Sequence, residues 1–100
     1  MVRVDIQFSG GLEILFGNQS TIVVDVSPPK QQTELDIAHL LVWLRDNLLT
    51  ERPELFMQGN TVRPGILVLV NDVDWELSGM LETIIEDDDT VVFISTLHGG

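Results

Sequence analysis

Two short stretches of this sequence, Ile66–Val70 and Val91–Ile94, are apolar at every position. A strand that is apolar on both faces is normally covered on both faces, so these stretches indicate the centre of a β-sheet. The chain offers one long amphipathic helix, which can cover only one face of that sheet. The second face must then meet loops, or it stays partly exposed as an apolar surface that binds another protein. The sequence leaves these two alternatives open.

The helix is predicted to follow Thr33, which can act as its N-cap with Asp36 as the reciprocal partner. Pro53 limits the helix, because the residue before a proline is disfavoured in the helical region. The apolar positions that recur at helical spacing are Ile37, Leu40, Leu41, Leu44 and Leu48.

Residues 2–26 are predicted to form an amino-terminal β-hairpin. Apolar and polar residues alternate along 2–8, and Leu12–Phe16 and Thr21–Val26 are further β-like stretches, separated by turns rich in glycine. The predicted order is strand, strand, helix, strand, short strand, strand. This order indicates an α+β fold in which a mixed sheet has one main helix packed across one face.

The length and the charge of the chain restrict the classes of function. One hundred residues make one small domain, which we assign to 1–95, followed by a flexible tail at 96–100. Sixteen acidic residues against five basic ones give a formal net charge of −11, which repels nucleic acid and favours a protein partner with a basic docking surface. We find no signal peptide and no membrane-spanning stretch, and therefore expect a soluble, cytoplasmic protein.

No catalytic motif is recognisable in the sequence. The chain has no cysteine, and neither His39 nor His98 has partners at the spacing of a catalytic triad or a metal site. The acidic residues at 72–76 and 86–89 lack the ligand spacing of a calcium loop. We therefore expect neither an enzyme nor a bound metal or cofactor, and keep a hydrolase or metal enzyme hidden among the carboxylates as a rival hypothesis.

The sequence ends in Gly99-Gly100. Glycine has no Cβ, so two in succession can run extended through a narrow channel and leave a terminal carbonyl open to attack. The alternative interpretation is a frayed end, as in most domains. Combined with a stable body that carries no catalytic group, this ending predicts a substrate for the chemistry of another protein.

Several blocks of residues resemble a known family. They resemble the β-grasp fold of ubiquitin and of small bacterial sulfur carriers, and more closely the ubiquitin-related modifier family of eukaryotes. The blocks are Leu15–Asn18, Leu41–Leu49, Glu51–Phe56, Val62–Asp72, Asp74–Leu77 and Ile94–Gly100.

This resemblance implies a monomeric sulfur carrier whose Gly100 is adenylated and then converted to a thiocarboxylate. The activating enzyme, with adenylation and rhodanese-type domains, uses ATP and a sulfur donor and recognises Leu97, His98 and Gly99. A transfer RNA thiolase then uses the sulfur for 2-thiolation of wobble uridines, and the same end becomes attached to lysines of target proteins through isopeptide bonds. The alternative is a ubiquitin-like binding module that acts only through its sheet surface.

Overall fold

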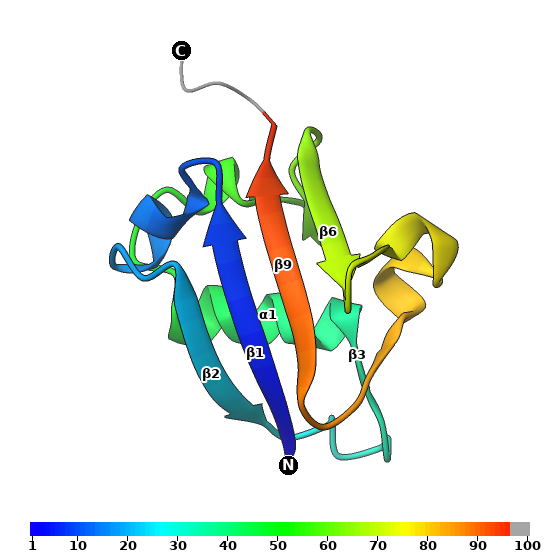
Figure 1. Cartoon of the computed structure of the whole chain (residues 1–100). Helices are drawn as coiled ribbons and strands as arrows, with labels where there is room; N and C mark the ends of the chain where they lie inside the picture. The colour runs from blue at the N-terminus through cyan, green and yellow to red at the C-terminus, as the bar shows by residue number, and fades with distance from the viewer. Residues whose placement is uncertain (97–100) are drawn as a thin grey trace.

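The computed structural model describes residues 1–96 and contains a mixed β-sheet with one main helix behind it (Figure 1). The strand order is β2-β1-β9-β6-β7, with β1 and β9 parallel and the other neighbours antiparallel. The predicted α+β fold, with the two apolar stretches inside the sheet, is confirmed. The strands are β1 (Val2–Ser9), β2 (Thr21–Val26), β6 (Ile66–Val70), β7 (Val73–Asp74) and β9 (Asp89–Ser95).

Helix α1 (Ile37–Asn47) packs on the inner face of the sheet, where Ile37, Leu40, Leu41 and Leu44 are fully buried. The helical spacing predicted these four positions and also Leu48, which is the C-cap of the helix and is half-buried. The predicted start at Thr33 is wrong. Asp36 is the N-cap, and its carboxylate accepts a hydrogen bond from the backbone N–H of His39 at 3.0 Å.

The later start of the helix has a tertiary cause. Leu35–Asp36 forms the short strand β3, which pairs antiparallel with β8 (Ile84–Ile85). Residues that are extended in a sheet pair cannot belong to the first turn of a helix. The N-cap is therefore the last residue of β3.

The predicted amino-terminal hairpin is wrong in one part. β1 and β2 pair antiparallel from Val2 opposite Val26, but Leu12–Phe16 between them forms a 3-10 helix, η1, and not a strand. Its buried residues Leu12, Leu15 and Phe16 are three and four positions apart, which is helical and not β spacing.

The remaining segments are short. They are η2 (Pro53–Leu55), β4 (Met57–Gln58), β5 (Thr61–Val62), η3 (Trp75–Leu77) and η4 (Met80–Glu82). The four phenylalanines of the chain gather in the core near the ends of β1 and β9. Phe56, which is fully buried, packs edge-on against Phe16 at 5.0 Å and Phe93 at 5.4 Å between ring centroids. This aromatic cluster packs under the end of β9, on the face of the sheet that α1 covers.

Candidate functional site

The candidate site is the place where the chain leaves the sheet at the end of β9. β9 lies in the middle of the sheet, between β1 and β6. Beyond Ser95, the backbone N–H and the side-chain hydroxyl of Thr96 both donate to the carbonyl oxygen of Gly65, the N–H at 2.9 Å. The backbone is therefore held up to residue 96, and Thr96 itself is exposed.

Gly10 permits the close approach of β1 and β9 at this exit. A Cβ built on Gly10 would lie only 2.3 Å from the carbonyl oxygen of Ser95, which is closer than any real contact. The φ angle of Gly10 is also +71°, a region that side chains disfavour. Sequence reasoning treated Gly10 only as a hairpin turn and missed this second role, because the contact joins segments far apart in the chain.

An apolar patch lies on the outer face of the sheet beside the exit. In the register of β6 and β9, Leu67 is opposite Ile94 and Leu69 is opposite Val92. Their neighbours in sequence, such as Val68 and Phe93, point to the helix and are fully buried. Leu67 is 44% exposed, and the other members of the patch are half-buried. We call Leu67, Leu69, Val92 and Ile94 the outer patch.

The outer patch answers the question that the sequence left open about the second face. Within residues 1–96, α1 covers one face of the sheet (Figure 1). On the other face, the apolar side chains of β6 and β9 stay partly in contact with solvent. Partly exposed apolar side chains grouped in one place are typical of a protein-binding surface.

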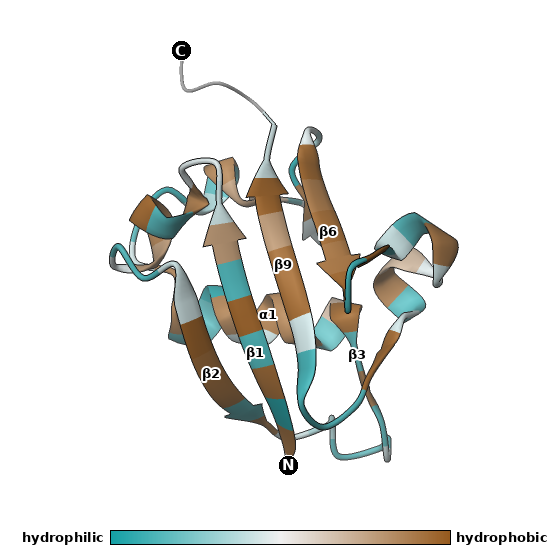
Figure 2. Ribbon diagram, viewed as in Figure 1, coloured by the Kyte–Doolittle hydropathy of each residue, from teal (hydrophilic) through white to brown (hydrophobic). Residues whose placement is uncertain are grey.

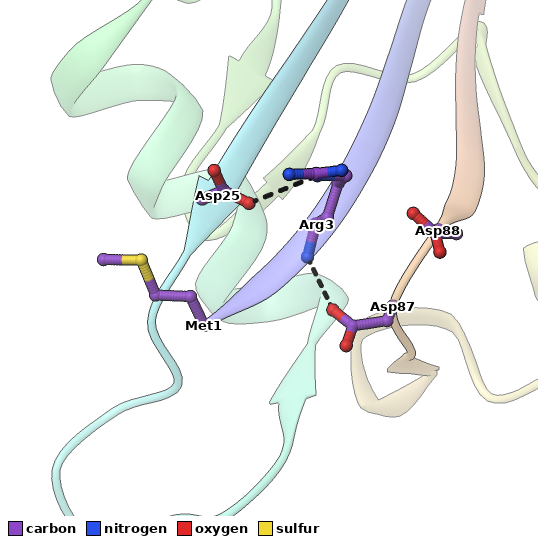
Figure 3. Close-up of a pocket in the computed structure, with 5 residues that line it drawn as sticks. All are labelled: Met1, Arg3, Asp25, Asp87 and Asp88. Atoms are coloured by element: carbon purple, nitrogen blue, oxygen red, sulfur yellow. Dashed lines mark hydrogen bonds and ion pairs between the residues drawn. The ribbon is translucent and has the colours of Figure 1, made fainter.

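A hollow lies at the start of β1 (Figure 3). Its volume is about 240 Å³, and it is lined by Met1, Arg3, Asp25, Asp87 and Asp88. The guanidinium of Arg3 lies 3.6 Å from the carboxylate of Asp25, and the backbone N–H of Arg3 donates to Asp87 at 2.8 Å. These contacts tie the β8–β9 turn to β1 and β2, and they bring together no nucleophile and base.

The other polar residues singled out in the sequence have local structural roles. His39 Nδ1 lies 2.5 Å from the carboxylate of Asp36, at the start of the helix. Asp74 accepts a hydrogen bond from the N–H of Glu76 at 2.9 Å and caps η3. Across the part of the chain that the structure describes, no group of three or more His, Cys, Asp or Glu side chains is placed to hold a metal ion.

The predicted tail residues Leu97, His98, Gly99 and Gly100 lie outside the described residues. At Thr96, the last described residue, the structure brings together the end of β9, the outer patch and the turn at 63–66. In this turn the N–H of Ile66 donates to the carbonyl of Arg63 at 3.2 Å.

None of the helices described in residues 1–96 combines the length and the apolar character needed to span a bilayer.

Comparisons with known proteins agree on one family. The family model described as Urm1 (Ubiquitin related modifier) matches residues 3–100. A "Ubiquitin-related modifier 1 homolog" of Chlamydomonas reinhardtii is 64% identical over the full length of both chains. The human "Ubiquitin-related modifier 1" is 55% identical, over 99% of this chain and 96% of its own.

Solved structures show the same architecture. The solution structure of Urm1 from Trypanosoma brucei superposes with a TM-score of 0.80 at 44% identity, covering 98% of this chain and 95% of that one. The crystal structure of CysO from Mycobacterium tuberculosis superposes with a TM-score of 0.70 at 21% identity, covering 94% of this chain and 99% of that one, a likeness of fold alone.

Proposed function

Because this chain belongs to the Urm1 family of ubiquitin-like modifiers and sulfur carriers, we propose that its reactive group is the carboxylate of Gly100. In this proposal residues 1–95 are the β-grasp body and 96–100 are the tail. An ATP-dependent enzyme with adenylation and rhodanese-type domains adenylates Gly100 and converts it to a thiocarboxylate. The carrier acts as a monomer, binds no cofactor itself and is not an enzyme.

The chemistry of a carboxylate supports the order of these steps. A carboxylate is a poor electrophile, so one of its oxygens first attacks the α-phosphate of ATP and releases pyrophosphate, which gives an acyl adenylate. That oxygen leaves with AMP when sulfur attacks the carbonyl carbon. A channel that excludes water then protects the acyl adenylate from hydrolysis. Gly99 and Gly100 have no side chains to obstruct such a channel. The chain has no cysteine, so the attacking sulfur belongs to the partner.

The described residues support a docking mode for the activating enzyme. Leu67 and Ile94 lie beside the exit of β9, so one partner can contact the outer patch and receive the tail at the same time. We propose that Leu97, His98 and Gly99 are the tail residues that it recognises. The net charge of −11 favours a basic surface on this partner.

Two uses of the activated end follow. The thiocarboxylate donates sulfur for 2-thiolation of the wobble uridine of transfer RNA, and the activated carbonyl also forms isopeptide bonds with lysines of target proteins. A carrier with a formal charge of −11 is a poor ligand for a phosphate backbone, so a separate thiolase holds the transfer RNA. A cytoplasmic location is part of the same proposal.

One observation carries the proposal: the central strand β9 ends beside an exposed apolar patch, in a chain that matches the Chlamydomonas relative over the full length of both. The experiment is intact-mass analysis after incubation with the activating enzyme, ATP and a sulfur donor. The expected result is replacement of one oxygen by sulfur at the carboxy terminus. A chain without Gly100 should stay unmodified and keep its thermal stability.

Absence of any mass change in the intact chain, with an enzyme that activates a known relative, would contradict the proposal.

The outer patch also favours a second candidate function, a ubiquitin-like module that binds partners only through its sheet. A complementation assay in cells that depend on this protein distinguishes the carrier from the binding module. A variant lacking Gly99 and Gly100 fails if the carrier proposal is correct and works if the binding module is correct.

A further inference from the structure

The loop between β6 and β8 presents apolar side chains to solvent. Leu77 is 82% exposed and Met80 is 45% exposed, flanked by Val73 at 47% and Ile84 at 39%. Figure 2 shows hydrophobic ribbon in this loop, at the side of the molecule beyond β6. Single exposed apolar residues are ordinary, whereas apolar residues grouped in one exposed segment are a feature of binding surfaces, and these four lie within twelve positions.

The loop is constructed so that these side chains remain outside. Trp75 and Thr83 are each 5% exposed and anchor the two ends of the loop in the protein. Between them, the N–H of Gly79 donates to the carbonyl of Trp75 at 3.1 Å, and the hydroxyls of Ser78 and Thr83 are 3.1 Å apart. Compact surface loops that are closed by their own hydrogen bonds are frequently functional. The outward position of Leu77 is therefore part of an ordered structure and not the result of a loose loop.

Met80 adds a second observation at the same place. Its φ angle is +55°, a left-handed conformation that a side chain with a Cβ adopts at a cost in free energy. Glycine would adopt it without that cost, and the preceding residue, Gly79, has a φ angle of +120°. A strained, exposed, apolar residue is a reason to look for a binding role, because strain is concentrated at functional sites.

The charge around this loop indicates what kind of partner fits. The chain has no lysine or arginine after Arg63, whereas Asp72, Asp74, Glu76 and Glu82 lie within or beside the loop. Asp74 caps η3, and Glu76 and Glu82 are exposed. Apolar side chains surrounded by carboxylates complement a surface that carries apolar anchors and basic residues together.

We propose that Val73, Leu77, Met80 and Ile84, which we call the loop patch, form a docking surface for a basic amphipathic helix of a partner protein. Apolar residues of that helix contact Leu77 and Met80, and its lysines and arginines face the surrounding carboxylates. This docking is separate from the chemistry at Gly100 and does not depend on it.

The loop lies away from the end at which β9 leaves the sheet. β6 runs antiparallel to β9, so its last residue, Val70, lies opposite Val91 near the start of β9, while β9 ends at Ser95. The rise along the intervening residues of β9 separates the two ends by about 13 Å. Figure 1 places the loop beside β6, away from the end where β9 leaves the sheet. The loop patch is therefore remote from the end at which β9 leaves the sheet, and the outer patch comes closest to the loop patch where Leu69 pairs with Asp74.

The test is a titration of the ¹⁵N-labelled full chain with a synthetic peptide of about 14 residues, built from leucine and lysine at helical spacing. We expect the chemical shift changes to concentrate at residues 72–84. Leu77→Ser should weaken binding at least about tenfold, as expected for an interface anchor. The matched control is Val23→Ser on β2, where the side chain is 58% exposed, and it should leave the affinity unchanged.

Met80→Gly should change peptide affinity and stability in opposite directions. It should weaken peptide binding, because it removes an anchor, and raise the denaturation midpoint, because it relieves the left-handed backbone. A second peptide, with glutamate in place of lysine, should not bind. Because salt screens only the charged contribution, binding of the unaltered chain at raised salt should exceed that of Leu77→Ser.

The proposal is overturned if the shift changes spread over the whole acidic surface and Leu77→Ser binds as tightly as Val23→Ser. That result would mean that attraction between net charges explains all of the binding. Thiocarboxylate formation on the Leu77→Ser variant is measured in parallel by intact mass. A normal mass change together with lost peptide binding separates this docking surface from the function proposed for Gly100.

Discussion

Replacement of Gly10 by alanine tests how the exit of β9 is built. The new Cβ would lie 2.3 Å from the carbonyl oxygen of Ser95 and 3.0 Å from its nitrogen, and both are backbone atoms that cannot rotate away. The left-handed conformation costs a non-glycine residue about 1–2 kcal/mol. Overpacking adds about 1–3 kcal/mol. We therefore expect Gly10→Ala to lower the free energy of unfolding by about 2–5 kcal/mol, against a total of about 5–15 kcal/mol for a typical domain.

Gly11→Ala is the matched control. Gly11 has a φ angle of +99°, but a Cβ there would meet no atom within 4 Å. This variant should lose only the conformational part, about 1–2 kcal/mol. The difference between the two variants isolates the contact with β9.

Urea unfolding followed by the fluorescence of the two tryptophans measures both variants. With a slope of about 1–3 kcal/mol per molar urea, the midpoints should differ by roughly 1 M. Hydrogen exchange provides a local readout, because the amide of Thr96 bonds to the carbonyl of Gly65 and should lose protection in Gly10→Ala alone. Equal midpoints for the two variants, with Thr96 equally protected, would refute the reasoning.

Three further predictions concern the core, the helix cap and the charge. Phe56→Ala should lower the free energy of unfolding by about 3–5 kcal/mol, measured by thermal denaturation, because it removes a fully buried ring from the aromatic cluster. Asp36→Ala should cost about 1 kcal/mol through loss of the bond to the His39 amide, whereas Thr33→Ala should cost almost nothing; the reverse order in urea melts would contradict the N-cap assignment. The association rate with the activating enzyme, measured by stopped flow, should fall as salt rises, because the net charge of −11 steers the encounter; a rate independent of salt would exclude such steering.

The periodicity of the sequence was sufficient to predict the main elements. The apolar stretches at 66–70 and 91–94 lie in the sheet as expected, and the helical residues Leu40 and Leu44 are fully buried. These patterns are local, because side chains alternate across a strand and recur every three or four positions along a helix. The helical spacing of Leu12, Leu15 and Phe16 was also present in the sequence, and the β-like composition of that stretch concealed it.

The helix start was less accessible from sequence. Thr33 is a good N-cap residue in isolation, and only the pairing of Leu35 with Ile85 explains why the N-cap lies three residues later, at Asp36. Tertiary contacts commonly override such local preferences. The same limit applies to Leu77 and Met80, whose apolar character gave no indication that they would face solvent.

The sequence by itself determined the class of fold, the acidic surface, the lack of cysteine and the Gly-Gly ending, because each of these is a matter of composition or of short-range periodicity. Only the tertiary structure decided that Gly10 lies against Ser95, that Leu67 and Ile94 share an exposed face, and that Leu77 points outward. The physical reason is that these features arise where segments far apart in the chain pack together, and strand register and burial are set by the whole sheet.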